Sequence, residues 1–191
     1  MTDIEHPHRT LNPYLFAPLG AVSGALYGLI QFGVLTPRTG DVGQVLMYIG
    51  AGLFYGVIVG YFLMRELDWH TWKWPLFVVA AAASYCAAVV LTIKLTSGTS
   101  GDLAMAGVGA LAGGLGALLL DLMTALLSQR GRHLKFLIPT VLIGAVLGAP
   151  IGKVVESESI VVWAAFFAVW QAAYAGWSAM TLSRRIIDPN A

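Results

Sequence analysis

The stretch LAMAGVGALAGGLGALLLDLMTALL, from Leu103 to Leu127, contains one charged residue, Asp121, and otherwise consists almost entirely of apolar and small side chains. A helix needs about 20 mostly apolar residues to cross the hydrocarbon core of a bilayer. The stretch is therefore long enough and apolar enough to predict a transmembrane helix.

Five further stretches have the same character, and short connections link all six. The whole chain is 58% hydrophobic and 11% charged, whereas a soluble domain carries about 25% charged residues. The sequence thus predicts an all-α polytopic membrane bundle, with residues 1–191 forming a single transmembrane domain. The six predicted spans are Tyr14–Leu35, Val42–Met64, Trp74–Leu95, Leu103–Leu127, Leu134–Val155 and Ile160–Leu182.

The distribution of basic residues predicts the orientation of the chain. With the N-terminus in the cytoplasm, eight basic residues lie on the cytoplasmic side and three lie outside, in agreement with the positive-inside rule for short loops. Both termini are then cytoplasmic, and we expect the protein in the plasma or inner membrane of the cell. The inner set is Arg9, Arg65, Lys73, Arg130, Arg132, Lys135, Arg184 and Arg185; the outer set is Arg38, Lys94 and Lys153.

Small residues recur at every fourth position in all six predicted spans. Residues four apart share a helix face, and a face without bulky side chains lets two backbones approach closely. The pattern predicts a tight bundle within one chain; a seam between identical copies, a docking face for a partner subunit, or helices that slide during transport are the alternatives. The clearest series are Gly20, Gly24 and Gly28; Gly52, Gly56 and Gly60; Gly144, Gly148 and Gly152; and Ala164, Ala168, Ala172 and Gly176.

The order of the spans suggests that the two halves of the chain are related. The first and fourth spans are glycine-rich, the second and fifth carry the regular glycine series, and the third and sixth are rich in alanine. Three spans in each half would make a 3+3 inverted repeat, an arrangement known from transporters.

In the fifth span, Pro139 and Pro150 predict a bent helix.

Asp121 is the main candidate for a functional residue within the membrane. It lies about 9 Å from the centre of the fourth span toward the cytoplasm, at 1.5 Å per residue. Ionisable groups at membrane depth are costly and often functional. Asp121 could hold a proton, a cation or a basic substrate; alternatively it forms a structural ion pair with Arg65, Arg130 or Arg132.

A polar stripe in the last span lies at the same depth. Gln171, Tyr174 and Ser178 are three and four residues apart, so they share one helix face. Together with Tyr55, Ser84 and Tyr85 they could line a small cavity open to the cytoplasm, with Asp121, Gln171, Tyr174, Ser178 and Tyr85 as the substrate-binding residues. The alternative is a set of hydrogen bonds between helices.

Several other classes of protein find little support in the sequence. A net charge of +1 and the lack of a basic run give no case for nucleic acid. Cys86 is the one cysteine, and we interpret it as a small buried hydrophobic residue. No catalytic or cofactor motif is present, although Asp68, His70 and His133 could serve an enzyme at the cytoplasmic interface.

Two functional hypotheses follow. The first is a small transporter or channel-like subunit that binds or moves a small-molecule solute through the glycine-rich bundle. The second is a non-catalytic structural or assembly subunit of a larger membrane complex. Both include the lipid bilayer as a partner, together with a homo-oligomer or a partner membrane subunit.

Overall fold

The structure is a computed structural model that describes residues 11–32, 41–67, 69–98, 100–128 and 134–187. All regular secondary structure within these ranges is helical, and six of the helices are long and apolar enough to cross a membrane. The fold is thus the all-α multi-pass bundle expected from hydropathy. The helices are α1 (Pro13–Ile30), α2 (Asp41–Glu66), α3 (Lys73–Thr96), α4 (Asp102–Ser128), α5 (Leu134–Gly148), α6 (Ile151–Glu156) and α7 (Ile160–Ile187).

The helix bounds agree closely with the predicted spans, apart from the division of the fifth span and differences of a few residues at some ends. Helix α1 ends at Ile30, and most of the predicted continuation to Leu35 falls outside the described residues. At its start, the side chain of Asn12 accepts a hydrogen bond of 2.9 Å from the Tyr14 backbone, and Pro13 occupies the first turn. An Asn cap followed by proline is a typical helix start.

The fifth span is divided in two, which confirms the predicted bend. Helix α5 ends at Gly148, and α6 begins at Ile151 after a turn at Ala149 and Pro150. Proline has no backbone N–H and its ring clashes with the carbonyl four residues earlier, so the helix cannot continue through Pro150. Pro139, by contrast, is accommodated inside α5.

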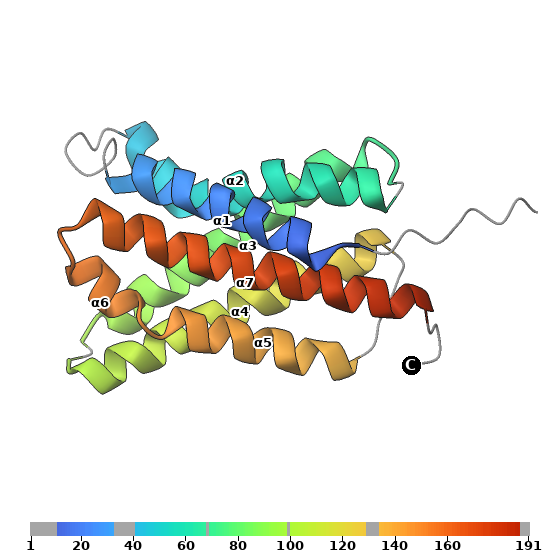
Figure 1. Cartoon of the computed structure of the whole chain (residues 1–191). Helices are drawn as coiled ribbons and strands as arrows, with labels where there is room; N and C mark the ends of the chain where they lie inside the picture. Colours follow the sequence, from blue (N-terminus) through green and yellow to red (C-terminus); the bar gives the residue numbers. More distant parts are fainter. Residues whose placement is uncertain (1–10, 33–40, 68, 99, 129–133, 188–191) are drawn as a thin grey trace, which may run out of the picture.

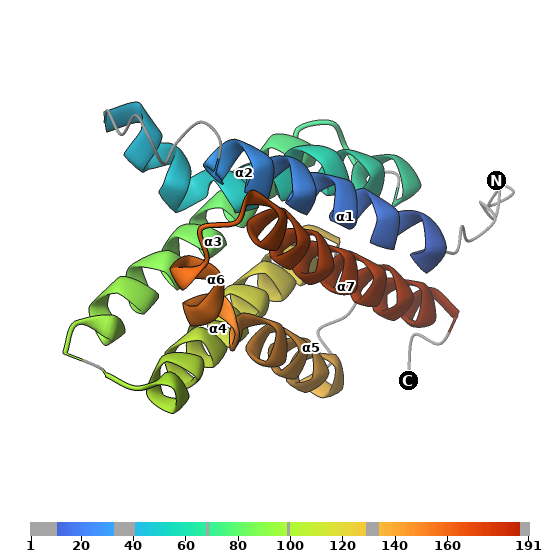
Figure 2. The same cartoon turned by 60° about the vertical axis from the view of Figure 1, so that its left-hand side comes forward.

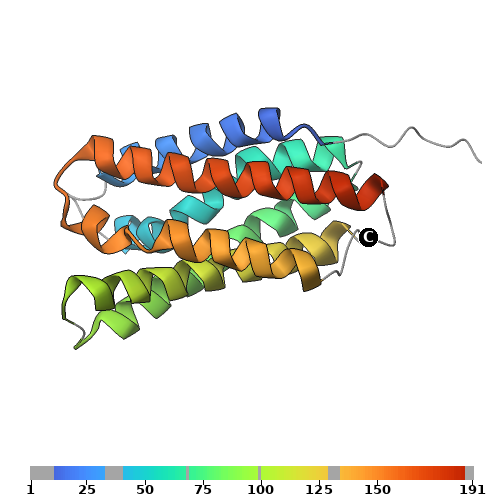
Figure 3. The same ribbon diagram turned by 60° about the horizontal axis from the view of Figure 1, so that its bottom comes forward.

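The long helices run side by side and alternate in direction along the chain (Figures 1 and 3). Helix α1 begins and α7 ends at the same end of the bundle, which we call the terminal end. Helix α6 lies at the opposite end, which we call the α6 end. Lys73 at the start of α3 donates a 2.7 Å hydrogen bond to the Leu127 carbonyl at the end of α4, so it caps that helix at the terminal end.

Three antiparallel helix pairs make the most extensive contacts in the bundle: α1 with α7, α2 with α3, and α4 with α5. In each pair, glycines bring the two backbones together. A Cβ on Gly24 would collide with the backbone of Phe167, and one on Gly52 with the backbone of Ala81; Gly113 and Gly144 face each other directly. The small-residue series are therefore used for packing within the chain, as the first interpretation of the sequence predicted.

Contacts between the pairs are looser. Helix α7 touches α5 and α2 only sparsely, whereas α3 packs on α4 and α1 on α2 to an intermediate extent. Seen from nearer the α6 end, the pairs surround a central region rather than forming stacked layers (Figure 2). The candidate site lies in this central region.

Candidate functional site

Buried polar side chains from three helices meet in the middle of the bundle. Tyr55 comes from α2, Asp121 from α4, and Gln171, Tyr174 and Ser178 from α7. Each of the five is buried, and Asp121 is only 5% exposed. We call these five residues the polar cluster.

Tyr55 is the centre of this cluster. Its side chain forms a hydrogen bond with Ser178, and it lies close enough to Asp121 to interact with it electrostatically. The rings of Tyr55 and Tyr174 meet edge to face, with centroids 5.7 Å apart. The structure thus brings Asp121, Tyr174 and Ser178 together around a tyrosine from a third helix.

Tyr174 and Gln171 connect the cluster to the neighbouring backbones. The Tyr174 hydroxyl donates a long hydrogen bond of 3.4 Å to the Ala117 carbonyl, one turn before Asp121 on α4. The Gln171 Nε2 donates a 3.1 Å hydrogen bond to the Ala51 carbonyl on α2. Within the described part of the chain, the Gln171 Oε1 is buried and accepts no hydrogen bond.

Of the three arginines expected near Asp121, only Arg65 belongs to the described residues with a described side chain. Arg65 is exposed at the end of α2, whereas Asp121 is buried. Arg130 and Arg132 lie outside the described residues. Tyr55 is the neighbour of Asp121 that the described interactions identify.

Tyr85 lies apart from the polar cluster, closer to the α6 end. Its hydroxyl is 3.2 Å from that of Tyr27 on α1, which also donates a 3.2 Å hydrogen bond to the Met47 carbonyl. The Tyr27 ring packs edge to face against Phe167 at a centroid distance of 4.7 Å. The five residues expected to bind substrate therefore divide into four in the polar cluster and Tyr85 beside it.

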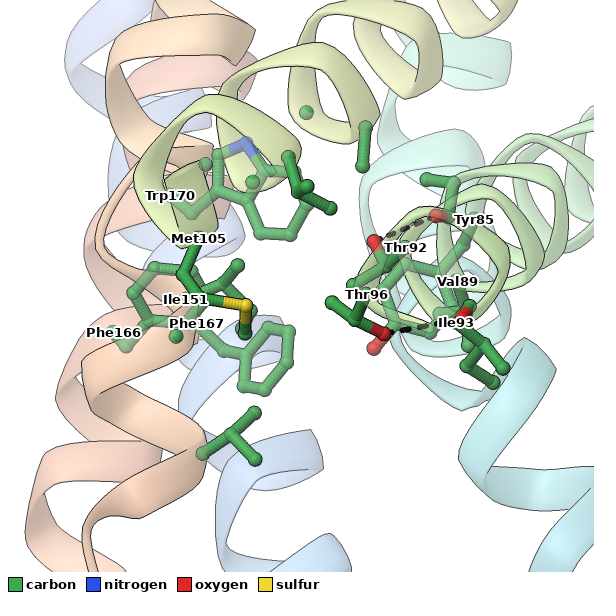
Figure 4. A pocket seen from close by; sticks show the side chains of 18 of the residues that line it. Tyr85, Val89, Thr92, Ile93, Thr96, Met105, Ile151, Phe166, Phe167 and Trp170 are labelled. Carbon is green, nitrogen blue, oxygen red and sulfur yellow. Dashed lines mark hydrogen bonds between the residues drawn. The ribbon is translucent and has the colours of Figure 1, made fainter. Parts of the chain in front are cut away.

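A cavity of about 360 Å³ lies mainly between α3, α4, α6 and α7. Figure 4 shows Met105, Ile151, Phe166, Phe167 and Trp170 on one side of it and Tyr85, Val89, Thr92, Ile93 and Thr96 on the other. We call it the outer cavity. It runs from the α6 end toward the middle of the bundle, and most of its lining is apolar or aromatic.

A smaller cavity, of about 70 Å³, continues toward the polar cluster. Tyr55, Gln171 and Tyr174 line it, and we call it the inner cavity. The two cavities share Tyr85, Ala88 and Trp170 in their linings, so they adjoin at these residues. The sequence led us to expect a cavity in the terminal half; the outer cavity lies in the other half, and Asp121 and Ser178 lie beyond the inner one.

The aromatic side of the outer cavity had not been identified from the sequence. Trp163, Phe167 and Trp170 are four and three residues apart, so they lie on one face of α7. This spacing is visible in the sequence. It does not distinguish an aromatic face that borders a cavity from one that fills a core.

Other side chains that could carry out chemistry have structural roles. Lys153 on α6 forms ion pairs with Asp102 at 2.7 Å and Glu156 at 3.1 Å. Ser84 donates to the Ala80 carbonyl of its own helix. The described residues contain no group of three His, Cys, Asp or Glu side chains able to hold a metal ion.

No family model, curated protein or solved structure matches this chain. Function must therefore be inferred from the chemistry of the polar cluster and of the two cavities.

Proposed function

We propose that this chain is a small membrane transporter, or a channel-like subunit of one, which binds and moves a small solute through the centre of its bundle. One observation carries the proposal: a buried polar cluster from three membrane helices adjoins a cavity that continues to one end of the bundle. The solute would enter the outer cavity and reach the inner cavity beside Gln171 and Tyr174.

The energetics of burial support a functional role for the polar cluster. Polar and ionisable side chains inside a membrane are expensive and tend to mark substrate or ion pathways. Asp121 and Gln171 occupy positions where leucine or alanine would pack without that cost. Each hydrogen bond between membrane helices stabilises a bundle by only about 0.6 kcal/mol on average. Stability alone is therefore a weak reason for polar groups at these positions.

The orientation and location are part of the same proposal. The excess of basic residues at the terminal end supports cytoplasmic termini, with the outer cavity on the opposite side of the membrane. We propose the plasma membrane, or the inner membrane of a bacterium, as the location.

The 3+3 inverted repeat is a hypothesis that the helix packing does not favour. Under such a repeat, the pairing of α1 with α2 corresponds to that of α4 with α5, and the pairing of α2 with α3 to that of α5 with α7. Both correspondences differ in the structure. Helices α4 and α5 form a glycine seam whereas α1 and α2 pack less closely, and α2 and α3 form a glycine seam whereas α5 and α7 touch only sparsely.

The structural-subunit hypothesis relied on glycine faces that would dock partner helices. Those faces are occupied within the chain, since the series on α1 packs on α7, the series on α2 packs on α3, and Gly109 and Gly113 pack on α5. This hypothesis therefore has less support than transport.

The test is uptake of a defined mixture of small solutes into proteoliposomes, with mass spectrometry of the contents. We expect one or more solutes to accumulate with the natural chain and to fall to the level of protein-free liposomes with Asp121→Asn. The substitution keeps the shape of the side chain and removes its ability to ionise.

The control is Asp102→Asn, which removes a carboxylate at the exposed start of α4 and should leave uptake unchanged. Both variants should purify in the yield and with the elution profile of the natural chain. Transport is contradicted if no solute exceeds the protein-free level, or if Asp121→Asn carries every solute as well as the natural chain does.

A further inference from the structure

We propose that the two cavities together bind an uncharged amphiphile, whose apolar or aromatic body fills the outer cavity and whose single hydrogen-bond donor reaches Gln171 in the inner cavity. The inference rests on the proposed function, because it names the class of substrate for the same site. Four observations lead to it: the lining of the outer cavity, the orphaned acceptor on Gln171, the hydrogen bonds of the neighbouring hydroxyls, and the lack of charged side chains in the described linings of both cavities.

The outer cavity determines the body of the ligand. Small-molecule sites commonly have volumes of about 300–1,000 Å³ and predominantly apolar linings with a few polar groups, and about 360 Å³ falls in that range. Trp163, Phe167 and Trp170 supply large flat surfaces along α7, which suit stacking against a ring or a hydrocarbon chain. The polar side chains of its lining include Gln31, Thr92 and Thr96, and the hydroxyls of Thr92 and Thr96 bond to backbone carbonyls of α3.

The Gln171 amide determines the head of the ligand. Its Nε2 must face the Ala51 carbonyl, because a carbonyl can only accept; this fixes the Oε1 on the other side of the amide. The Oε1 is buried and meets no donor among the described residues, while the side chain lines the inner cavity. A buried acceptor without a partner is costly, so a donor that enters the inner cavity is bound there selectively.

The hydroxyl groups that line the inner cavity already have hydrogen-bond partners. Tyr55 bonds to Ser178, Tyr174 to the Ala117 carbonyl, and Ser84 to the Ala80 carbonyl. Tyr85 shares a hydrogen bond with Tyr27. Among the described side chains of this cavity, the Gln171 Oε1 is the buried acceptor that lacks a donor, and a single donor from a ligand suffices.

Charge is the last property of the ligand that the linings indicate. Among the described residues no charged side chain lines either cavity, and Asp121 lies beyond the inner one. Moving an ion into such surroundings without a counter-ion in contact is unfavourable. An alcohol or a phenol with an apolar body meets all three requirements.

The test uses three probes that share one ring system and differ in their head groups: 2-naphthol, 2-methoxynaphthalene and the 2-naphthyl-trimethylammonium ion. Binding to the full chain in lipid nanodiscs is measured by equilibrium dialysis, with empty nanodiscs subtracted to remove partition into lipid. We expect saturable binding of 2-naphthol, about ten-fold tighter than that of the methyl ether, because only the naphthol donates to a buried acceptor.

Two variants identify the residues. Gln171→Leu keeps a similar side-chain volume, and we expect naphthol and its ether to bind with equal affinity, because the acceptor is gone. Ala88→Phe fills the junction of the cavities and should weaken both probes. Its matched control is Leu111→Phe on the exposed face of α4, which lines neither cavity and should change nothing.

Three results overturn the inference: no saturable binding of 2-naphthol, equal affinity of the natural chain for naphthol and ether, or tightest binding of the ammonium ion. These comparisons use the natural chain alone, so the outcome stands even if a variant fails to fold. Uptake that requires Asp121 but no naphthol binding leaves transport in place and removes the amphiphile. Selective naphthol binding without uptake of any solute leaves the amphiphile site in place and removes transport.

Discussion

Along the seam between α1 and α7, a Cβ on Gly20, Gly24 or Gly28 would collide with the facing backbone, whereas between α7 and α3 aromatic side chains border a cavity of about 360 Å³. Both regions involve α7. One face of this helix is packed as tightly as a backbone allows, and another leaves space for a small molecule.

The difference separates the close packing of the bundle from its open space. Lipid tails are as apolar as leucine, so helices in a membrane gain little by burying apolar side chains and depend on close van der Waals contact. The glycine seams supply that contact within each helix pair. The region between the pairs is then able to hold polar groups and cavities without carrying the main packing energy.

Gln171 takes part in both regions. Its backbone faces Gly20 in the seam, and its side chain reaches across to the Ala51 carbonyl and the inner cavity. A residue in the rigid part of the bundle thus holds the amide of the candidate site. Such support from a fixed element is what a precise binding site needs.

The largest effect on stability should come from adding one carbon atom to a seam. In Gly24→Ala the new Cβ meets the carbonyl of Phe167 and the backbone of Ala168. Because backbone atoms cannot rotate away, the helices must separate, and we expect a loss of about 1–3 kcal/mol in the free energy of unfolding. Titration with SDS in mixed micelles, followed by circular dichroism, measures the loss.

Gly107→Ala is the matched control. It adds the same atom to α4 at a position where a Cβ would meet nothing within 4 Å. We expect stability to stay equal or to rise slightly, since alanine is the better helix former. Equal losses in both variants would show that the seam is no tighter than the surface of the bundle.

The sequence was sufficient to predict the six spans and the existence of the seams, for reasons of length and spacing. A run such as Leu103–Leu127 has few alternatives to a membrane helix, and glycines at every fourth position must share a face. The choice of partner for each face could not be predicted. Similar stripes occur on all six spans, so α1 could have paired with α2 as plausibly as with α7.

The candidate site was predictable only in part. Asp121, Gln171, Tyr174 and Ser178 were identified by polarity and depth, and the structure gathers them around Tyr55. Tyr85 was placed in the same group; it bonds to Tyr27 on α1 and lines both cavities, the inner one together with Gln171 and Tyr174. The outer cavity lay beyond sequence reasoning, because a cavity is a gap between helices and its size depends on how the pairs are arranged.

A smaller effect is expected from replacing the Gln171 side chain. Gln171→Leu removes the hydrogen bond to the Ala51 carbonyl and also removes the orphaned Oε1. Losing the hydrogen bond destabilises the bundle, whereas losing a buried acceptor that has no donor stabilises it. We therefore expect the free energy of unfolding to change by about 1 kcal/mol or less. The SDS titration used for Gly24→Ala measures this change, and a loss as large as in the seam would assign the amide to structure.

The smallest effect should come from adding carbon atoms to the space between the pairs. Ala112 on α4 is buried and lines the outer cavity, so Ala112→Val places two methyl groups beside an empty volume instead of a backbone. New van der Waals contacts and the modest helix cost of a β-branched residue oppose each other. We expect the free energy of unfolding to stay within about 0.5 kcal/mol of that of the natural chain. If this variant lost as much stability as Gly24→Ala, the outer cavity would be tightly packed in solution, and α7 would have no open face on which a solute could bind.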